Sequence, residues 1–140
     1  MTEQRDMPWV AVDKSTRLVY SAAWNDQQQL QVYDLDSFSF VKTLSVNTDD
    51  NSPLLPKEIQ GGAFYEGELY LCTNIDDGIW KMNLQSGKVT FILSDPIFEK
   101  FAYEMEGIDF WDLRDKGLGV MHVFGNFMTM REKSIKNYNP

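Results

Sequence analysis

Two stretches of the sequence, LQVYDLDSFSFVKTL at Leu30–Leu44 and GIWKMNLQSGKVTFIL at Gly78–Leu93, share one pattern and decide the fold. Each starts with an apolar and aromatic run, passes through Asp-Leu or Asn-Leu into a polar turn, and ends in a second β-rich run. Leu35 in the first stretch aligns with Leu84 in the second, 49 residues later. The shared pattern predicts a repeated unit in which two strands are joined by a tight turn.

The segments upstream of these stretches repeat at nearly the same interval. TRLVYSAAW, GELYLCTN and GLGVMHVFG align through Leu18, Leu69 and Leu118, with separations of 51 and 49 residues. A further short strand precedes each segment, and the three strands begin at Trp9, Gln60 and Glu106. Self-similarity at about 50 residues, with three or four short strands per unit, is typical of β-propellers.

We therefore predict an all-β fold, a β-propeller fragment of about three blades of four-stranded antiparallel sheet. Residues 1–140 form a single domain with blade-like units at approximately 8–46, 57–94 and 103–138. Three blades are fewer than the four that natural propellers need to close a ring, and open apolar flanks favour aggregation. Three arrangements follow: a homodimer that makes a six-bladed ring, a missing propeller half, or a partner that covers the flanks.

Local signals refine this prediction. Asp77-Gly78 and Ser86-Gly87 can supply the positive φ that tight turns need. Only Asp95–Met105 suits a helical turn, because Pro96 can occupy its first position. Arg131–Tyr138 is the candidate for an outer strand of the last unit.

Composition excludes several classes of partner. The chain is 43% apolar with a net charge of −8, so it is expected to fold and to bind neither nucleic acid nor an anionic membrane surface. No signal peptide is expected in the chain as given, and the compartment stays unassigned. The single cysteine, Cys72, rules out an internal disulfide and lies in the apolar run LYLCT, where burial is expected.

At these residues the chain resembles the six-bladed propeller group of gluconolactonases, paraoxonases, strictosidine synthase-like and phytase-like proteins, and covers about half of such a propeller. QGGAF at Gln60–Phe64, ELYL at Glu68–Leu71 and the MEGI and MHV segments are similar to a poorly characterised propeller family whose members are often secreted. The resemblance implies that an acidic residue at the start of an inner strand can hold calcium. Glu106 fits that role, and Gln60 occupies the corresponding place in the second unit.

The stretch YEMEGIDFWD, at Tyr103–Asp112, carries four carboxylates. Strand alternation places Glu104, Glu106, Ile108 and Phe110 on one face, so only the two glutamates can act together. One interpretation is that Glu106 points into a wet central channel and Glu104 is solvated. The alternatives are a metal site completed by groups outside the chain, and a catalytic carboxylate pair.

Other candidate residues are fewer. Trp24, beside Asn25 and Asp26 at a loop, is the best exposed candidate for stacking on a sugar, whereas the other tryptophans suit packing between blades. The only histidine, His122, is expected in the core or at an interface, since no nucleophile motif accompanies it.

The leading functional hypothesis is a non-enzymatic ligand- or protein-binding module, completed by self-association, with Glu106, Gln60, Glu104 and Trp24 as candidate residues. One alternative is a divalent-cation-dependent lactonase/esterase-type hydrolase, for which calcium would be the cofactor. A sugar-binding half-propeller is the other.

Overall fold

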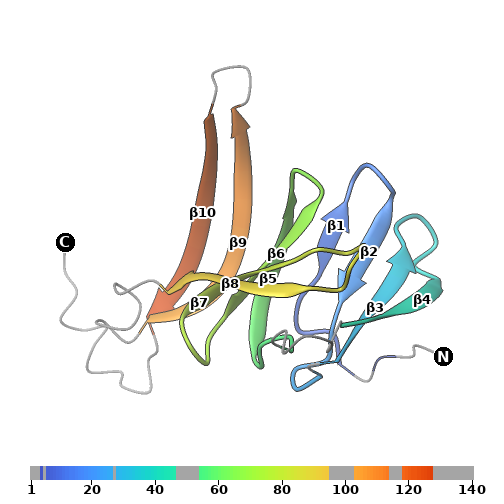
Figure 1. The fold of residues 1–140 in the computed structure, drawn as a ribbon, viewed down its shortest axis with the longest axis horizontal. Coiled ribbons are helices and arrows are strands. Elements are labelled where there is room, and N and C mark those ends of the chain that lie inside the picture. Colours follow the sequence, from blue (N-terminus) through green and yellow to red (C-terminus); the bar gives the residue numbers. More distant parts are fainter. Residues whose placement is uncertain are drawn as a thin grey trace.

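The computed structural model describes residues 4, 6–26, 28–46, 54–94, 103–113 and 118–127. These residues form ten strands in three antiparallel sheets that stand side by side, and none of them lies in a helix (Figure 1). No described helix therefore has the length and apolar character needed to cross a membrane. The predicted all-β class is confirmed. Tyr103–Met105 lie in a strand, so the helical turn predicted at Asp95–Met105 is wrong there, and its other residues lie outside the described ones.

Each sheet follows the order of the sequence. The first contains β1 (Ala11–Asp13), β2 (Leu18–Ser21), β3 (Gln29–Asp34) and β4 (Phe40–Ser45). The second contains β5 (Ile59–Tyr65), β6 (Glu68–Thr73), β7 (Gly78–Met82) and β8 (Val89–Ser94). The third pairs β9 (Tyr103–Leu113) with β10 (Leu118–Phe127). The predicted outer strand at Arg131–Tyr138 lies outside the described residues.

Among the first strands of the three sheets, β5 neighbours both β1 and β9, and the later strands extend away from them. A Cβ added at Gly61 would lie 2.7 Å from the Cα of Gly107 in β9, so only glycine allows this approach. On the other side of β5, a Cβ at Gly62 would meet the Trp9 ring at 2.9 Å. Alternate residues of β5 thus contact the sheets on either side, as in the side-by-side blades of a β-propeller.

Two apolar clusters fill the junctions between sheets. The first joins blades one and two and includes Trp9, Ala11, Tyr20, Leu30, Val32, Leu69, Leu71 and Met82. The second joins blades two and three and consists of Ala63, Cys72, Ile79, Met105 and Ile108. Cys72 is fully buried as predicted, and burial raises the pKa of its thiol to about 12. It is therefore an unreactive thiol at neutral pH.

The repeat extends to individual hydrogen bonds. Oδ1 of Asp34 accepts a bond from the backbone N–H three residues further on at 2.8 Å, and Oδ1 of Asn83, 49 residues later, does the same at 2.8 Å. The next residue in each turn has a positive φ, 56° at Phe38 and 70° at Gly87. The same side-chain-to-backbone turn therefore joins the third and fourth strands of both complete blades.

Candidate functional site

A β-bulge shapes the start of β9. Strand β10 pairs with Met105 and then with Gly107, so Glu106 is an extra residue without a partner in the ladder. The bulge reverses the alternation, and Met105 and Ile108 both lie in the cluster against the second blade. The prediction that Glu104, Glu106 and Ile108 share one face is therefore wrong.

Two of the predicted ligand-binding residues do meet at this end of the inner strands. Gln60 Nε2 on β5 donates a hydrogen bond to Glu104 Oε1 on β9 at 2.8 Å. Burial raises the pKa of Glu104, and repulsion by Glu106 and Glu58 raises it further, while the bond from Gln60 opposes these effects. Glu106 is exposed and Glu104 is half-buried, so the predicted solvation of Glu104 is only partial.

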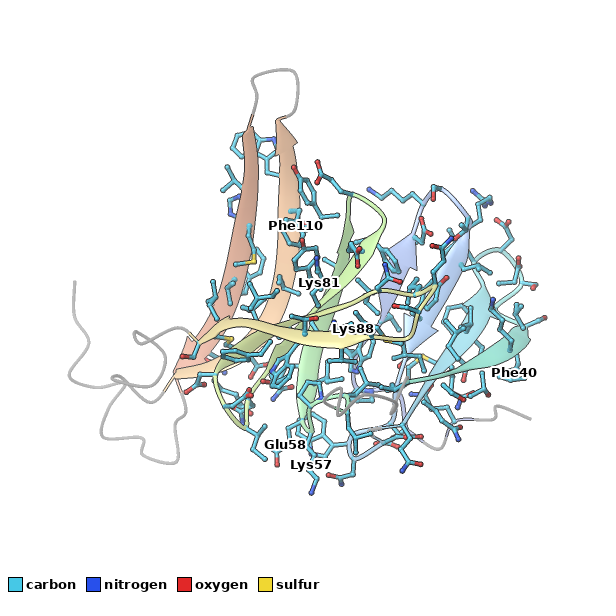
Figure 2. All side chains as sticks on the ribbon, in the orientation of Figure 1. Phe40, Lys57, Glu58, Lys81, Lys88 and Phe110 are labelled. Carbon is cyan, nitrogen blue, oxygen red and sulfur yellow. The ribbon has the colours of Figure 1, made fainter. Side chains whose placement is uncertain are left out.

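The remaining predicted residue, Trp24, joins the same end through its backbone. The carbonyl of Trp24 accepts a bond from the Glu58 N–H at 3.1 Å, and the Trp24 N–H donates to Asp6 Oδ2 at 3.2 Å. Glu58 in turn accepts from the Asn74 N–H at 3.1 Å and holds a left-handed φ of 54°. Figure 2 labels Glu58 and Lys57 at the lower end of the fold, near the start of β5. We call Glu58, Gln60, Glu104 and Glu106 the acidic rim.

Glu58 was not singled out in the sequence. It directly precedes the strand IQGGAFY, but nothing in its neighbourhood shows that backbone bonds to two other loops would fix it beside β9. The one signal in the sequence is a carboxylate directly before a predicted inner strand, which is also the ground on which Glu106 is predicted.

The acidic rim does not by itself form a metal centre. Among the residues that the structure describes, no three His, Cys, Asp or Glu side chains lie where they could hold one ion together. Calcium favours six to eight oxygen ligands. A calcium site at Glu106 would thus need most of its ligands from outside the described part of the chain.

The other end of the inner strands holds a hollow of about 1020 Å³. The turn after β1, the turn between β5 and β6, and the middle of β9 surround it, with Lys14, Asp13, Glu66 and Asp109 as its charged residues. Phe110 lies on one wall, stacked on Tyr65 with ring centroids 4.8 Å apart. No sequence motif indicated this hollow.

Two expectations about packing fail in the third blade. His122, predicted in the core or at an interface, is exposed, so the place in the core is wrong and the place at an interface stays a prediction. Trp111, predicted to pack between blades, is 59% exposed and lies beside His122 with ring centroids 6.3 Å apart. Trp9 and Trp80 do pack at the junction of blades one and two, as predicted.

No family model and no curated protein matches the chain. Similar solved structures include Kuenenia stuttgartiensis hydrazine synthase, at 11% identity and a TM-score of 0.49, over 78% of this chain and 28% of that one. The Myceliophteria thermophila Cps50 (Swd1) β-propeller domain matches at 11% identity and a TM-score of 0.47, over 96% and 43%. The computationally designed Ika4 protein matches at 12% identity and a TM-score of 0.39, over 89% and 93%.

The chain thus spans less than half the length of the first two structures. At TM-scores below 0.5 none of these likenesses carries the assignment. The β-propeller fragment is assigned from the side-by-side sheets and their inner strands alone.

Proposed function

We propose that the chain is a non-enzymatic binding module of the β-propeller type, which offers its acidic rim to a cationic group such as a basic segment of a partner protein. The observation that carries the proposal is the convergence of the rim: Gln60 holds Glu104 by a hydrogen bond of 2.8 Å, and Glu58 and Glu106 lie close enough to help raise the pKa of Glu104, after burial. Carboxylates held together in this way repel one another. An incoming ammonium or guanidinium group would relieve that repulsion and form charge-assisted hydrogen bonds.

The charge balance supports this choice of ligand. The whole chain carries a net charge of −8. Within the described residues, the one ion pair joins Arg17 to Asp36, both exposed, and leaves the acidic rim without a basic partner. An acidic surface of this kind raises the local concentration of cations and speeds the association of basic partners.

The proposal includes the assembly of the module. We infer that the chain supplies about half of a propeller of the six-bladed type that its sequence resembles. Its third sheet needs a further sheet against its open side, from a second copy of the chain or from a missing propeller half. The exposure of Trp111 and Phe124 on that sheet supports the inference.

A thermal-shift titration with a lysine-rich peptide tests the rim. A ligand that binds only the folded state stabilises it by about 2.7 kcal/mol at 100 times its Kd. We expect stabilisation of the wild type, and loss of that stabilisation in the double variant Glu104→Gln, Glu106→Gln. Glu66→Gln, an exposed change at the other end of β5, is the matched control and should keep the full shift.

Other outcomes would redirect the proposal. No shift with the peptide, or an equal shift in the double variant, would contradict binding at the rim. Stabilisation by calcium that Glu106→Gln abolishes would favour the cation-dependent hydrolase. Stabilisation by sugars that Trp24→Ala abolishes would favour the sugar-binding module.

A further inference from the structure

The two junctions inside the chain share an aromatic contact. Phe64 packs against Tyr20 of the first blade with ring centroids 5.1 Å apart, and Phe110 packs against Tyr70 of the second blade at 4.7 Å. Each phenylalanine comes from the inner strand of one blade and each tyrosine from the second strand of the preceding blade. In the third blade, His122 on β10 corresponds to these tyrosines, because it pairs with Asp109, the residue before Phe110.

His122 belongs to a bare face of the third sheet. Directly opposed residues of antiparallel strands share a face, and here they form three layers. We call this surface the outer face, and its layers are the pairs Trp111–Val120, Asp109–His122 and Gly107–Phe124. Trp111 is 59% exposed and Phe124 57%, and they flank a hollow of about 330 Å³. Large aromatic side chains exposed together mark an interaction surface.

The opposite flank of the fragment is covered in part by the chain itself, although Val10, Phe38 and Phe40 are exposed there. On the face of the first sheet that is turned away from the second, Gln4 is buried. Its Nε2 donates to Ser21 Oγ at 2.9 Å, and its Oε1 accepts from the Tyr33 hydroxyl at 3.3 Å. A sheet docking on this flank would have to break these bonds, and buried polar groups are costly to leave unpaired.

This difference between the flanks disfavours a ring of two copies. In such a ring the outer face of one copy would dock on the Gln4 flank of the other. In β5, Phe64 follows the residue that pairs with Tyr70. In β1, the corresponding residue, which follows the partner of Tyr20, is Val12. The new junction would therefore lack the aromatic contact found at both existing junctions.

The outer face is instead complementary to itself. When two copies are related by a two-fold axis parallel to the strands, β9 of one lies over β10 of the other. Asp109 then faces His122 of the partner subunit, in both directions, and a carboxylate against an imidazole is a favourable pair. Phe124 faces Gly107 of the partner subunit, which carries no side chain. Within one copy, a Cβ at Gly107 would lie 3.8 Å from Cδ2 of Phe124, an ordinary contact. If the two-fold axis instead ran across the strands, each Asp109 would face the partner's Asp109, which is a pair of like charges.

We propose that the outer face binds a second copy of this chain, back to back, with β9 over the partner's β10. The inference rests on the part of the proposed function in which the third sheet takes a further sheet from a second copy, and it replaces a closed six-bladed ring by a back-to-back pair. It is independent of the acidic rim. Two aligned sheets then pack face to face at about 10 Å. The dimer is a pair of half-propellers joined at their third blades.

Sedimentation equilibrium of the full chain tests the proposal. We expect a mass of about twice 16.2 kDa. Phe124→Lys should raise the dissociation constant about 30-fold or more, as loss of a buried aromatic hot-spot contact does. The matched control is Phe91→Lys, a 45% exposed phenylalanine on β8, which should leave the dimer unchanged.

An exchange of charges tests the orientation. Asp109→His and His122→Asp should each weaken the dimer, because each places like groups face to face, and the double exchange should restore it. A monomeric wild type at several hundred micromolar would overturn the proposal. So would a dimer that resists Phe124→Lys but is broken by Val10→Lys on the Gln4 flank, which would indicate a ring.

The rim and the interface fail separately. The lysine-peptide shift measured on the Phe124→Lys variant reports on the rim alone. If Phe124→Lys keeps both the peptide shift and the dimer, the proposed interface is overturned and the proposed rim stands. If the variant loses both, the proposed rim is overturned and the proposed interface stands.

Discussion

Gly61→Ala should destabilise the fold, because the contact between β5 and β9 depends on the missing side chain. The added Cβ would lie 2.7 Å from the Gly107 Cα, 3.1 Å from the Ile108 nitrogen and 3.2 Å from the Cys72 sulfur. Two of these atoms are backbone and cannot rotate away. Since carbon atoms pack at about 3.5–4.0 Å, strand β9 would have to retreat by about 1 Å.

The expected cost follows from overpacking. Extra methyl groups in a well-packed core cost about 1–3 kcal/mol. For a chain of 140 residues, each kcal/mol lowers the melting temperature by about 2–4 °C, so we expect a drop of roughly 2–12 °C. Urea denaturation followed by circular dichroism gives the free energy of unfolding directly. Both it and the melting curve should be measured at several protein concentrations, so that any contribution of self-association is seen.

Gly107→Ala is the matched control on the facing strand. A Cβ at Gly107 would have Phe124 Cδ2 as its near neighbour, at 3.8 Å, which is an ordinary contact. The variant should lie within about 0.5 kcal/mol of its parent, or gain slightly from a more restricted unfolded chain. If Gly61→Ala proved as stable as Gly107→Ala, the packing of blade two on blade three described above would be wrong.

Three further predictions concern single residues. Glu104 has a raised pKa, so its stabilising contribution is complete below its unfolded pKa and is lost as the pH rises through the folded value. Glu104→Gln should therefore gain over the wild type by a few tenths of a kcal/mol in urea denaturation at pH 7, less at pH 4. A gain that grew on acidification would contradict this sign. Gly87→Ala should cost about 1 kcal/mol in a melting experiment, since its φ of 70° strains any side chain, and an unchanged melting temperature would refute that turn. Cys72 should resist thiol reagents until the chain unfolds, because it is fully buried with a pKa of about 12. Reaction of the native protein at neutral pH would show that the second junction opens.

The fold was predictable because its units are local. Leu30–Leu44 and Gly78–Leu93 each contain a strand, a polar turn and a strand, and turn chemistry acts over four or five residues. Asp34 and Asn83 sit at matching places in that turn, and their side chains make matching bonds. Short-range signals of this kind need no knowledge of the rest of the chain.

The candidate site was predictable only in part, because it is assembled from distant segments. The sequence predicts Gln60 and Glu104 as candidate residues on separate grounds. The hydrogen bond between them depends on the close approach of β5 and β9 at Gly61. Glu58 owes its place to bonds with the backbone of Trp24 and Asn74. The exposure of His122 could not be read from VMHVF, because an apolar strand reads the same whether its second face is covered or bare.

The bulge at Glu106 links the rim to the outer face, and the sequence does carry its mark. Because side chains alternate with a period of two, one extra residue inverts every position on one side of it. Without the bulge, Met105 and Ile108 would point in opposite directions, and one of them would leave the junction with the second blade. In M-E-G-I two apolar residues stand three apart around a glycine, which is wrong for a regular strand and typical of a bulged one. The same inversion leaves Glu104 free to meet Gln60 while Asp109 remains on the outer face with its partner His122. The positions of the acidic rim and of the outer face, the two surfaces proposed for binding, therefore both depend on one unpaired residue in β9.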